Sequence, residues 1–120
     1  MSFVWVFLGG GLGSICRYGV SLLIAESGQP FPVATLIANL LSSMLLGALV
    51  VLSLRQMLAV EYRLLLMTGF CGGFSTFSTF SNETFQLLQQ GHYFYAAANV
   101  VVSIALGLIC IYLGMKGAQL

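Results

Sequence analysis

The chain has 120 residues, of which 59% are hydrophobic and only 6% are charged. Soluble domains carry roughly 25% charged residues, so this composition excludes an ordinary soluble domain and indicates an integral membrane protein. The net charge of +1 provides no basic patch that would bind nucleic acid or anionic lipid.

The hydrophobic pattern predicts four membrane-spanning helices in a single all-α domain that covers residues 1–120. A spanning helix needs about 20 apolar residues. The expected spans are residues 2–25, 33–54, 62–91 and 94–115, with the first loop at 26–32. Four helices are too few to enclose an aqueous lumen, so we expect any conduit to lie at an interface between copies of the chain.

The first expected span contains a cluster of glycines and one arginine. A nucleotide-binding loop is excluded, because Ser14 stands where a GxGxxG motif that starts at Gly9 needs its last glycine. Gly9 and Gly13 instead form a small-xxx-small pattern that favours close helix packing. Arg17 has two interpretations: a cation at a vestibule that attracts anions, or a side chain that reaches the nearby membrane surface.

Polar residues of the second span recur at helical spacing and form one stripe, made by Thr35, Asn39, Ser42 and Ser43. Asn39 is the most costly of these side chains to expose to lipid. It either contributes an interhelical hydrogen bond, typically worth about 1 kcal/mol or less, or it lines a pore and donates to an anion. Both interpretations remain open from the pattern alone.

The third span changes character at residues 69–83, which read GFCGGFSTFSTFSNE. Adjacent glycines followed by hydroxyl residues are poor material for a continuous helix, and we predict a break near Gly72–Ser75. Irregular backbone at membrane depth persists only where protein buries it or where it lines a cavity. Its freed carbonyls and amides can coordinate ions.

Beyond the predicted break, Phe77 and Phe80 lie on one face of the helix, interleaved with hydroxyl residues. Aromatic rings have a positive edge that can contact an anion, although packing is the ordinary role of such a face. Glu83 is expected either at this conduit or as an exposed residue near the membrane surface. In the fourth span, Asn99 and Ser103 form a second sparse polar stripe with Gly107.

Chemistry other than transport has little support. There is no Ser/His/Asp set, no paired carboxylates and no metal-ligand spacing, so an enzyme is not expected. The three cysteines fall in three different spans and are interpreted as small apolar residues: Cys16, Cys71 and Cys110.

Basic residues favour one side of the membrane by a small margin. Arg55, Arg63 and Lys116 lie on the side that carries both termini, and the positive-inside rule therefore places the termini in the cytoplasm. A margin of two or three charges also permits insertion in both orientations.

These residues resemble the Fluc family of small bacterial fluoride channels over essentially the whole chain. The resemblance rests on the glycine-rich first span with its arginine, on residues 35–39 (TLIAN) and above all on residues 69–81 (GFCGGFSTFSTFS). The chain departs from the usual pattern at Ser75, where threonine is common, and at Ser42, where glycine is common.

The resemblance implies an antiparallel, dual-topology homodimer in the bacterial inner membrane, with two fluoride pores along the subunit interface. By analogy, Phe77 and Phe80 present ring edges to fluoride and Asn39 donates to it, while Ser78, Thr79 and Thr35 line the path. Arg17 and Glu83 are expected near the vestibules. A structural sodium ion is expected on main-chain carbonyls of Gly72 and Ser75.

Two rival functions remain at this point. One is a proton-coupled exporter of the small multidrug type, which relies on an acidic residue in the centre of the first span; here none precedes Glu26. The other is a membrane assembly subunit without transport activity.

Overall fold

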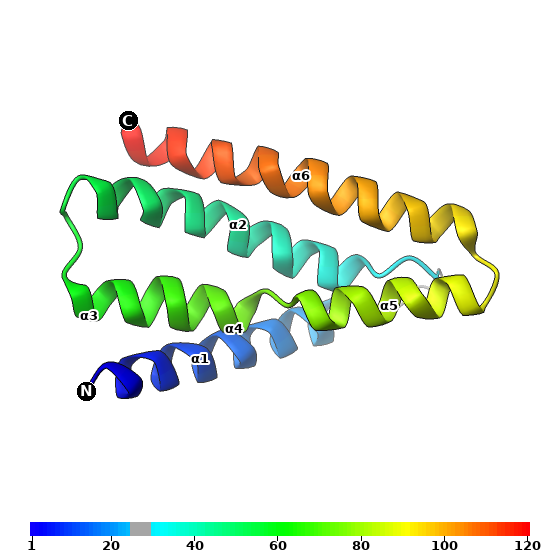
Figure 1. The fold of residues 1–120 in the computed structure, drawn as a ribbon, viewed down its shortest axis with the longest axis horizontal. Helices are drawn as coiled ribbons and strands as arrows, with labels where there is room; N and C mark the ends of the chain where they lie inside the picture. The colour runs from blue at the N-terminus through cyan, green and yellow to red at the C-terminus, as the bar shows by residue number, and fades with distance from the viewer. Residues whose placement is uncertain (25–29) are drawn as a thin grey trace.

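The computed structural model describes residues 1–24 and 30–120, and all of the regular elements in these residues are helices. Figure 1 shows them in chain order as α1 (Ser2–Leu23), α2 (Val33–Leu54), α3 (Val60–Arg63), the π-helix η1 (Leu64–Cys71), α4 (Gly72–Phe74), α5 (Phe77–Gln89) and α6 (Tyr93–Gln119). The predicted four helical segments are confirmed, with α3 to α5 together forming the third. Residues 26–29, which make up most of the predicted first loop, lie outside the described residues, as does residue 25 at the end of the predicted first span.

The segments are arranged as two side-by-side pairs. α1 packs along α3, η1 and α4, whereas α2 packs along α6 (Figure 1). Both termini lie at the same end of the molecule as the turn between α2 and α3. This arrangement is the one expected for an even number of membrane passes.

Glycines allow α1 to approach the third segment closely. A Cβ added at Gly9 would collide with the Leu65 carbonyl, and one added at Gly13 would collide with the Phe70 carbonyl. From the other side, a Cβ at Gly73 would collide with the Gly10 carbonyl. The packing role predicted for Gly9 and Gly13 is therefore confirmed.

The second pair uses the same device. A Cβ at Gly47 of α2 would collide with the Ile111 carbonyl of α6, and one at Gly114 of α6 would collide with the Met44 carbonyl of α2. Both pairs of the fold thus depend on backbone contact at glycine.

The third segment is broken at Ser75 and Thr76. Ser75 has φ −89° and ψ 155°, and Thr76 has φ −152° and ψ 118°, so both residues are extended. The break was predicted near Gly72–Ser75 from the adjacent glycines and the hydroxyl residues that follow them, and it lies at the hydroxyl residues rather than at the glycines. Both glycines are helical within α4, and Gly73 serves the close contact with α1.

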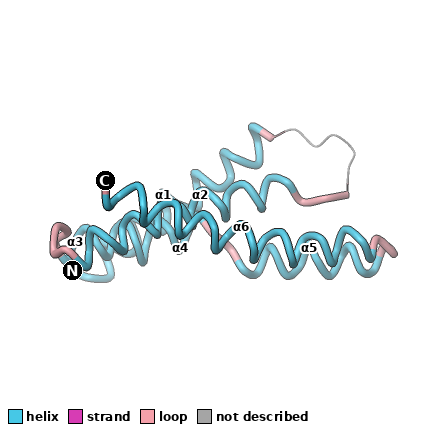
Figure 2. The backbone as a smooth tube through the Cα atoms, turned by 90° about the horizontal axis from the view of Figure 1, so that it is seen from above, coloured by secondary structure: helices cyan, strands magenta, loops and turns pink. Residues whose placement is uncertain are grey.

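Three of the helices are long and apolar enough to cross a membrane: α1, α2 and α6. The third segment is divided by its break and is not among them. Figure 2 shows α5 continuing beyond the break, on the side of the molecule away from both termini. Many large apolar side chains remain exposed on the single chain, including Phe77, which is 79% exposed.

Candidate functional site

The break is held by a hydrogen bond from the second segment. The Thr76 backbone N–H donates to Asn39 Oδ1 at 3.0 Å. In a continuous helix this N–H would donate to the carbonyl of Gly72, four residues earlier. Asn39 therefore accepts the hydrogen bond that the Gly72 carbonyl would accept in a continuous helix. The Gly72 carbonyl has consequently lost its helical donor.

Arg17 binds a second carbonyl at the end of α4. Its Nε donates to the Gly73 carbonyl oxygen at 3.1 Å, and the side chain is half-buried. A cation at the C-terminal end of a helix also interacts favourably with the helix dipole. Arg17 thus contacts the protein interior at the break, which simple snorkelling to the surface does not require.

The polar stripe of α2 divides into two roles. Ser42 is 3% exposed and donates to the Cys71 carbonyl at 3.1 Å, so it joins α2 to η1. Ser75 donates to the same carbonyl at 2.7 Å. The other role belongs to Thr35 and Asn39. Thr35 lies beside the predicted site residues Thr79 and Glu83, and Asn39 contacts the break.

Thr76 also caps the start of α5. Its Oγ1 accepts a hydrogen bond from the Thr79 backbone N–H at 3.2 Å, which satisfies one of the free donors at the helix start. The Thr76 and Thr79 hydroxyls are also hydrogen-bonded to each other, with 3.2 Å between their oxygens. The sequence interpretation did not select Thr76, although a hydroxyl residue directly before an amphipathic helix is a recognised helix-start signal.

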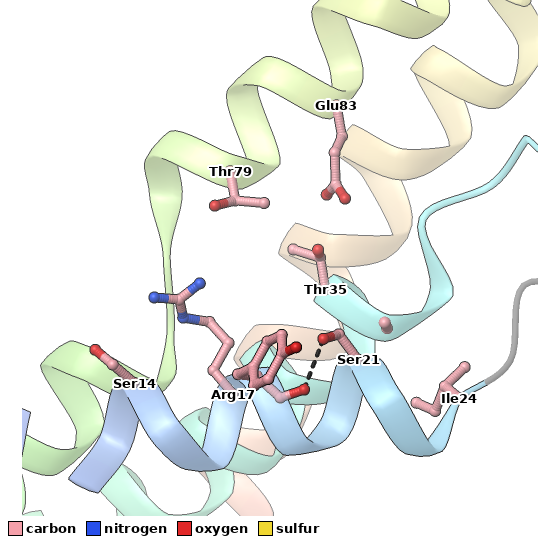
Figure 3. Close-up of a pocket in the computed structure, with 9 residues that line it drawn as sticks. Ser14, Arg17, Ser21, Ile24, Thr35, Thr79 and Glu83 are labelled. Carbon is pink, nitrogen blue, oxygen red and sulfur yellow. Dashed lines mark hydrogen bonds between the residues drawn. The ribbon is translucent and has the colours of Figure 1, made fainter. Parts of the chain in front are cut away.

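A cavity of about 480 Å³ opens between α1, α2 and α5. Arg17, Thr35, Thr79 and Glu83 all line it, so the structure brings four of the predicted site residues together. In Figure 3, Arg17 from α1 and Thr79 and Glu83 from α5 point toward the same space. The remaining lining residues are Ser14, Tyr18, Ser21, Ile24 and Ala34.

The aromatic pair lies apart from this cavity. The ring centroids of Phe77 and Phe80 are 5.9 Å apart, with 43° between the ring planes. Phe77 and Ser78 are exposed on the single chain and Phe80 is half-buried. None of the three is among the cavity-lining residues in the described part of the chain.

The middle of α5 is tied to α6. Asn99 is 1% exposed, and its Nδ2 donates to Thr84 Oγ1 at 2.8 Å. The Thr84 hydroxyl donates to the Phe80 carbonyl at 2.8 Å, and Ser103 donates to Asn99 Oδ1 at 3.3 Å. The polar stripe of the fourth span thus supports the helix that carries Phe80.

The break offers oxygens that suit a hard cation. The Gly72 carbonyl has lost its helical donor to Asn39, and an atom added at the Gly72 Cβ position would meet nothing within 4 Å. Within residues 1–24 and 30–120 no cluster of His, Cys, Asp or Glu could hold a metal ion. The two predicted sodium ligands, the main-chain carbonyls of Gly72 and Ser75, are oxygens of the kind that coordinates sodium at broken helices.

Comparison with known proteins shows the family to which the chain is similar. A profile of the family described as CrcB-like protein, Camphor Resistance (CrcB), matches residues 4–115. A protein of Coxiella burnetii (strain CbuK_Q154) named fluoride-specific ion channel FluC is 45% identical over 124 aligned positions, which cover 100% of both chains. The proteins of the same name from Rhodospirillum rubrum and Chlorobaculum tepidum are 44% and 48% identical, over 100% and 93% of this chain and 96% and 90% of their own lengths.

Proposed function

We propose, because the chain belongs to the CrcB-like protein family, that it is a fluoride-selective channel that lets cytoplasmic fluoride leave the cell passively. The chain is a multi-pass integral membrane protein, and its relatives carry the name fluoride-specific ion channel. The observation that carries the proposal is the state of Asn39. Its amide oxygen is engaged by the Thr76 N–H, so the group that it presents elsewhere is an NH₂ donor.

Fluoride chemistry explains why such donors matter. Fluoride is small and strongly hydrated, so a pore has to replace its water with hydrogen-bond donors. Asn39, the hydroxyls of Thr35, Ser78 and Thr79, and the ring edges of Phe77 and Phe80 are the donors that we assign to this path. A narrow path with weak donors excludes chloride, which is larger and gains less from them.

The proposed channel is an antiparallel homodimer with two pores along the subunit interface. Exposed Phe77 and Ser78 on the single chain support an interface on this side of α5. Cysteine crosslinking checks this arrangement. A cysteine placed at Ser78 is expected to crosslink between copies in a cysteine-free background, whereas a cysteine at Leu120 is not. Crosslinking at Leu120 with none at Ser78 would contradict the antiparallel dimer.

We further propose that the carbonyls of Gly72 and Ser75, together with those of a second copy, hold a structural sodium ion. Bound there, the ion would neutralise the carbonyl dipoles at the break, and Asn39 and Arg17 fix the backbone around it. Replacing sodium by N-methylglucamine is expected to lower the thermal stability of the purified dimer. Equal stability in both salts would contradict the sodium site.

The function is tested with purified protein in liposomes loaded with either fluoride or chloride. We expect rapid fluoride release, measured with a fluoride-selective electrode, and no chloride release above protein-free liposomes. A proton gradient should have no effect beyond its electrical potential. Equal release of the two anions, or release that needs a proton gradient, would contradict a passive fluoride channel.

A further inference from the structure

We infer that Thr76 is a positioning residue that sets the direction of two hydrogen-bond donors of the channel, the Asn39 amide and the Thr79 hydroxyl. The inference rests on the proposed function and adds to it a residue without an assigned role. Thr76 lies at the break in an extended conformation, half-buried between α2 and the start of α5. From there its backbone contacts one donor and its side chain contacts the other.

The backbone of Thr76 orients Asn39. A backbone N–H can only donate, so the Asn39 atom that faces it at 3.0 Å has to be the carbonyl oxygen. This removes the ambiguity between the two ends of a side-chain amide. The NH₂ end is consequently directed away from the break, where it is available to an anion. Without the break, the Thr76 N–H would donate to the Gly72 carbonyl within the helix and would not orient the Asn39 amide.

The side chain of Thr76 orients Thr79. The Thr76 oxygen accepts from the Thr79 N–H, and the hydroxyl oxygens of Thr76 and Thr79 are joined by a hydrogen bond of 3.2 Å. We assign Thr76 as the donor in this contact, which leaves the proton of Thr79 for another partner. Thr79 lines the 480 Å³ cavity opposite Arg17, as Figure 3 shows. Thr76 thereby turns a hydroxyl that can either donate or accept into a donor toward an anion.

This role differs from simple helix capping. A cap needs only an oxygen that accepts from the Thr79 N–H, and asparagine supplies one as well as threonine does. Directing the Thr79 hydroxyl additionally needs the proton of a hydroxyl at residue 76. Serine keeps both functions, asparagine keeps the cap without a hydroxyl, and valine keeps neither function at nearly the same volume as threonine.

The test compares T76S, T76N and T76V with the unmodified protein, in the same liposomes and with the same fluoride electrode. Thermal unfolding and dimer content are measured on each sample. We expect T76S to conduct within about twofold of the unmodified protein. T76N and T76V should each lose about tenfold in fluoride flux, the effect of about one hydrogen bond in the conduction pathway. Stability should fall in T76V but not in T76N.

The outcomes separate this inference from the proposed function. If the unmodified protein conducts fluoride and T76N conducts equally well, Thr76 is only a cap and the inference is wrong. If T76S loses as much flux as T76V, the hydroxyl is not the cause and the inference is again wrong. An unmodified protein that releases no fluoride would overturn the proposed function, and the role of Thr76 would fall with it.

Discussion

Asn39 and Arg17 show how single polar side chains make an irregular backbone stable at membrane depth. Asn39 accepts from the Thr76 N–H and Arg17 donates to the Gly73 carbonyl, so each replaces a helical partner that the break removes. An unsatisfied backbone group costs several kcal/mol in hydrocarbon. These residues therefore allow the two extended residues at the break to exist, and they place an amide and a guanidinium group beside it.

The aromatic pair provides the first prediction at this scale. Replacing Phe77 or Phe80 by isoleucine removes the positive ring edge and keeps an apolar side chain of similar size. We expect each variant to lose about tenfold or more in fluoride flux, equivalent to about 1.4 kcal/mol, while the dimer persists. F85I is the matched control, because Phe85 lies on the same helix and is also exposed. Unchanged flux in both F77I and F80I would remove the aromatic contact from the mechanism.

A second prediction concerns Arg17. R17M keeps the length of the side chain but loses the hydrogen bond to the Gly73 carbonyl. Hydrogen bonds to charged groups contribute about 1.5 to 3 kcal/mol, and half-burial places Arg17 near the lower figure. The free energy of unfolding in detergent should therefore fall by about 1.5 kcal/mol, and R17K should recover part of the loss. If R17M unfolds like the unmodified protein, Arg17 does not support the break.

At the scale of elements, glycine determines which helices can lie together. α1 contacts the third segment through Gly9 and Gly13, and α2 contacts α6 through Gly47 and Gly114. Lipid is as apolar as leucine, so helices in a membrane associate through close packing and hydrogen bonds and gain little from apolar burial. Backbone contact at glycine supplies the packing, and the Ser42 and Asn99 hydrogen bonds join the elements further.

The two glycines Gly11 and Gly13 allow a matched test of this packing. A methyl group at Gly13 would collide with the Phe70 backbone, whereas one at Gly11 meets nothing within 4 Å. We expect G13A to lower the free energy of unfolding by at least about 2 kcal/mol, as other overpacked sites do. G11A should be neutral or slightly stabilising, because alanine favours helix over glycine. The measurement is reversible unfolding in mixed detergent, and equal stabilities would show that α1 does not pack as described.

The elements also show what the sequence can and cannot predict. Residues 33–54 match the bounds of α2, and the first and last helices were placed within a few residues, because long apolar runs set them directly. The sequence predicted the position of the break, but it did not show that Gly72 and Gly73 stay helical. The role of Gly73 depends on which helix lies opposite, and a single sequence does not contain that contact.

For the site, the sequence predicted which residues take part better than it predicted which residues they contact. Arg17, Thr35, Thr79 and Glu83 were selected one by one, and the structure brings them to a single cavity. Ser42 belonged to the same stripe as Asn39, and both contact the third segment one turn apart along α2, Ser42 at Cys71 and Asn39 at Thr76. Thr76 was missed because its function depends on Asn39, which lies 37 residues away.

At the scale of the whole molecule, the single chain exposes more surface than a compact protein of its size. Its accessible surface is 7594 Å², whereas a compact protein of 12.9 kDa exposes roughly 6300 Å². The difference is about 1300 Å², and a stable protein interface covers roughly 800 Å² on each partner. In the proposed dimer, a second copy covers part of this surface on the side of the exposed Phe77 and Ser78, and lipid covers the rest.

Selectivity for fluoride is the central claim, and the reversal potential of purified protein in a planar bilayer tests it most directly. With fluoride on one side and an equal concentration of chloride on the other, the account predicts a large potential. Its sign should be that of fluoride diffusing from its own side, and T76S should preserve it. A reversal potential near zero under this gradient would mean that both anions pass equally, and it would contradict the account.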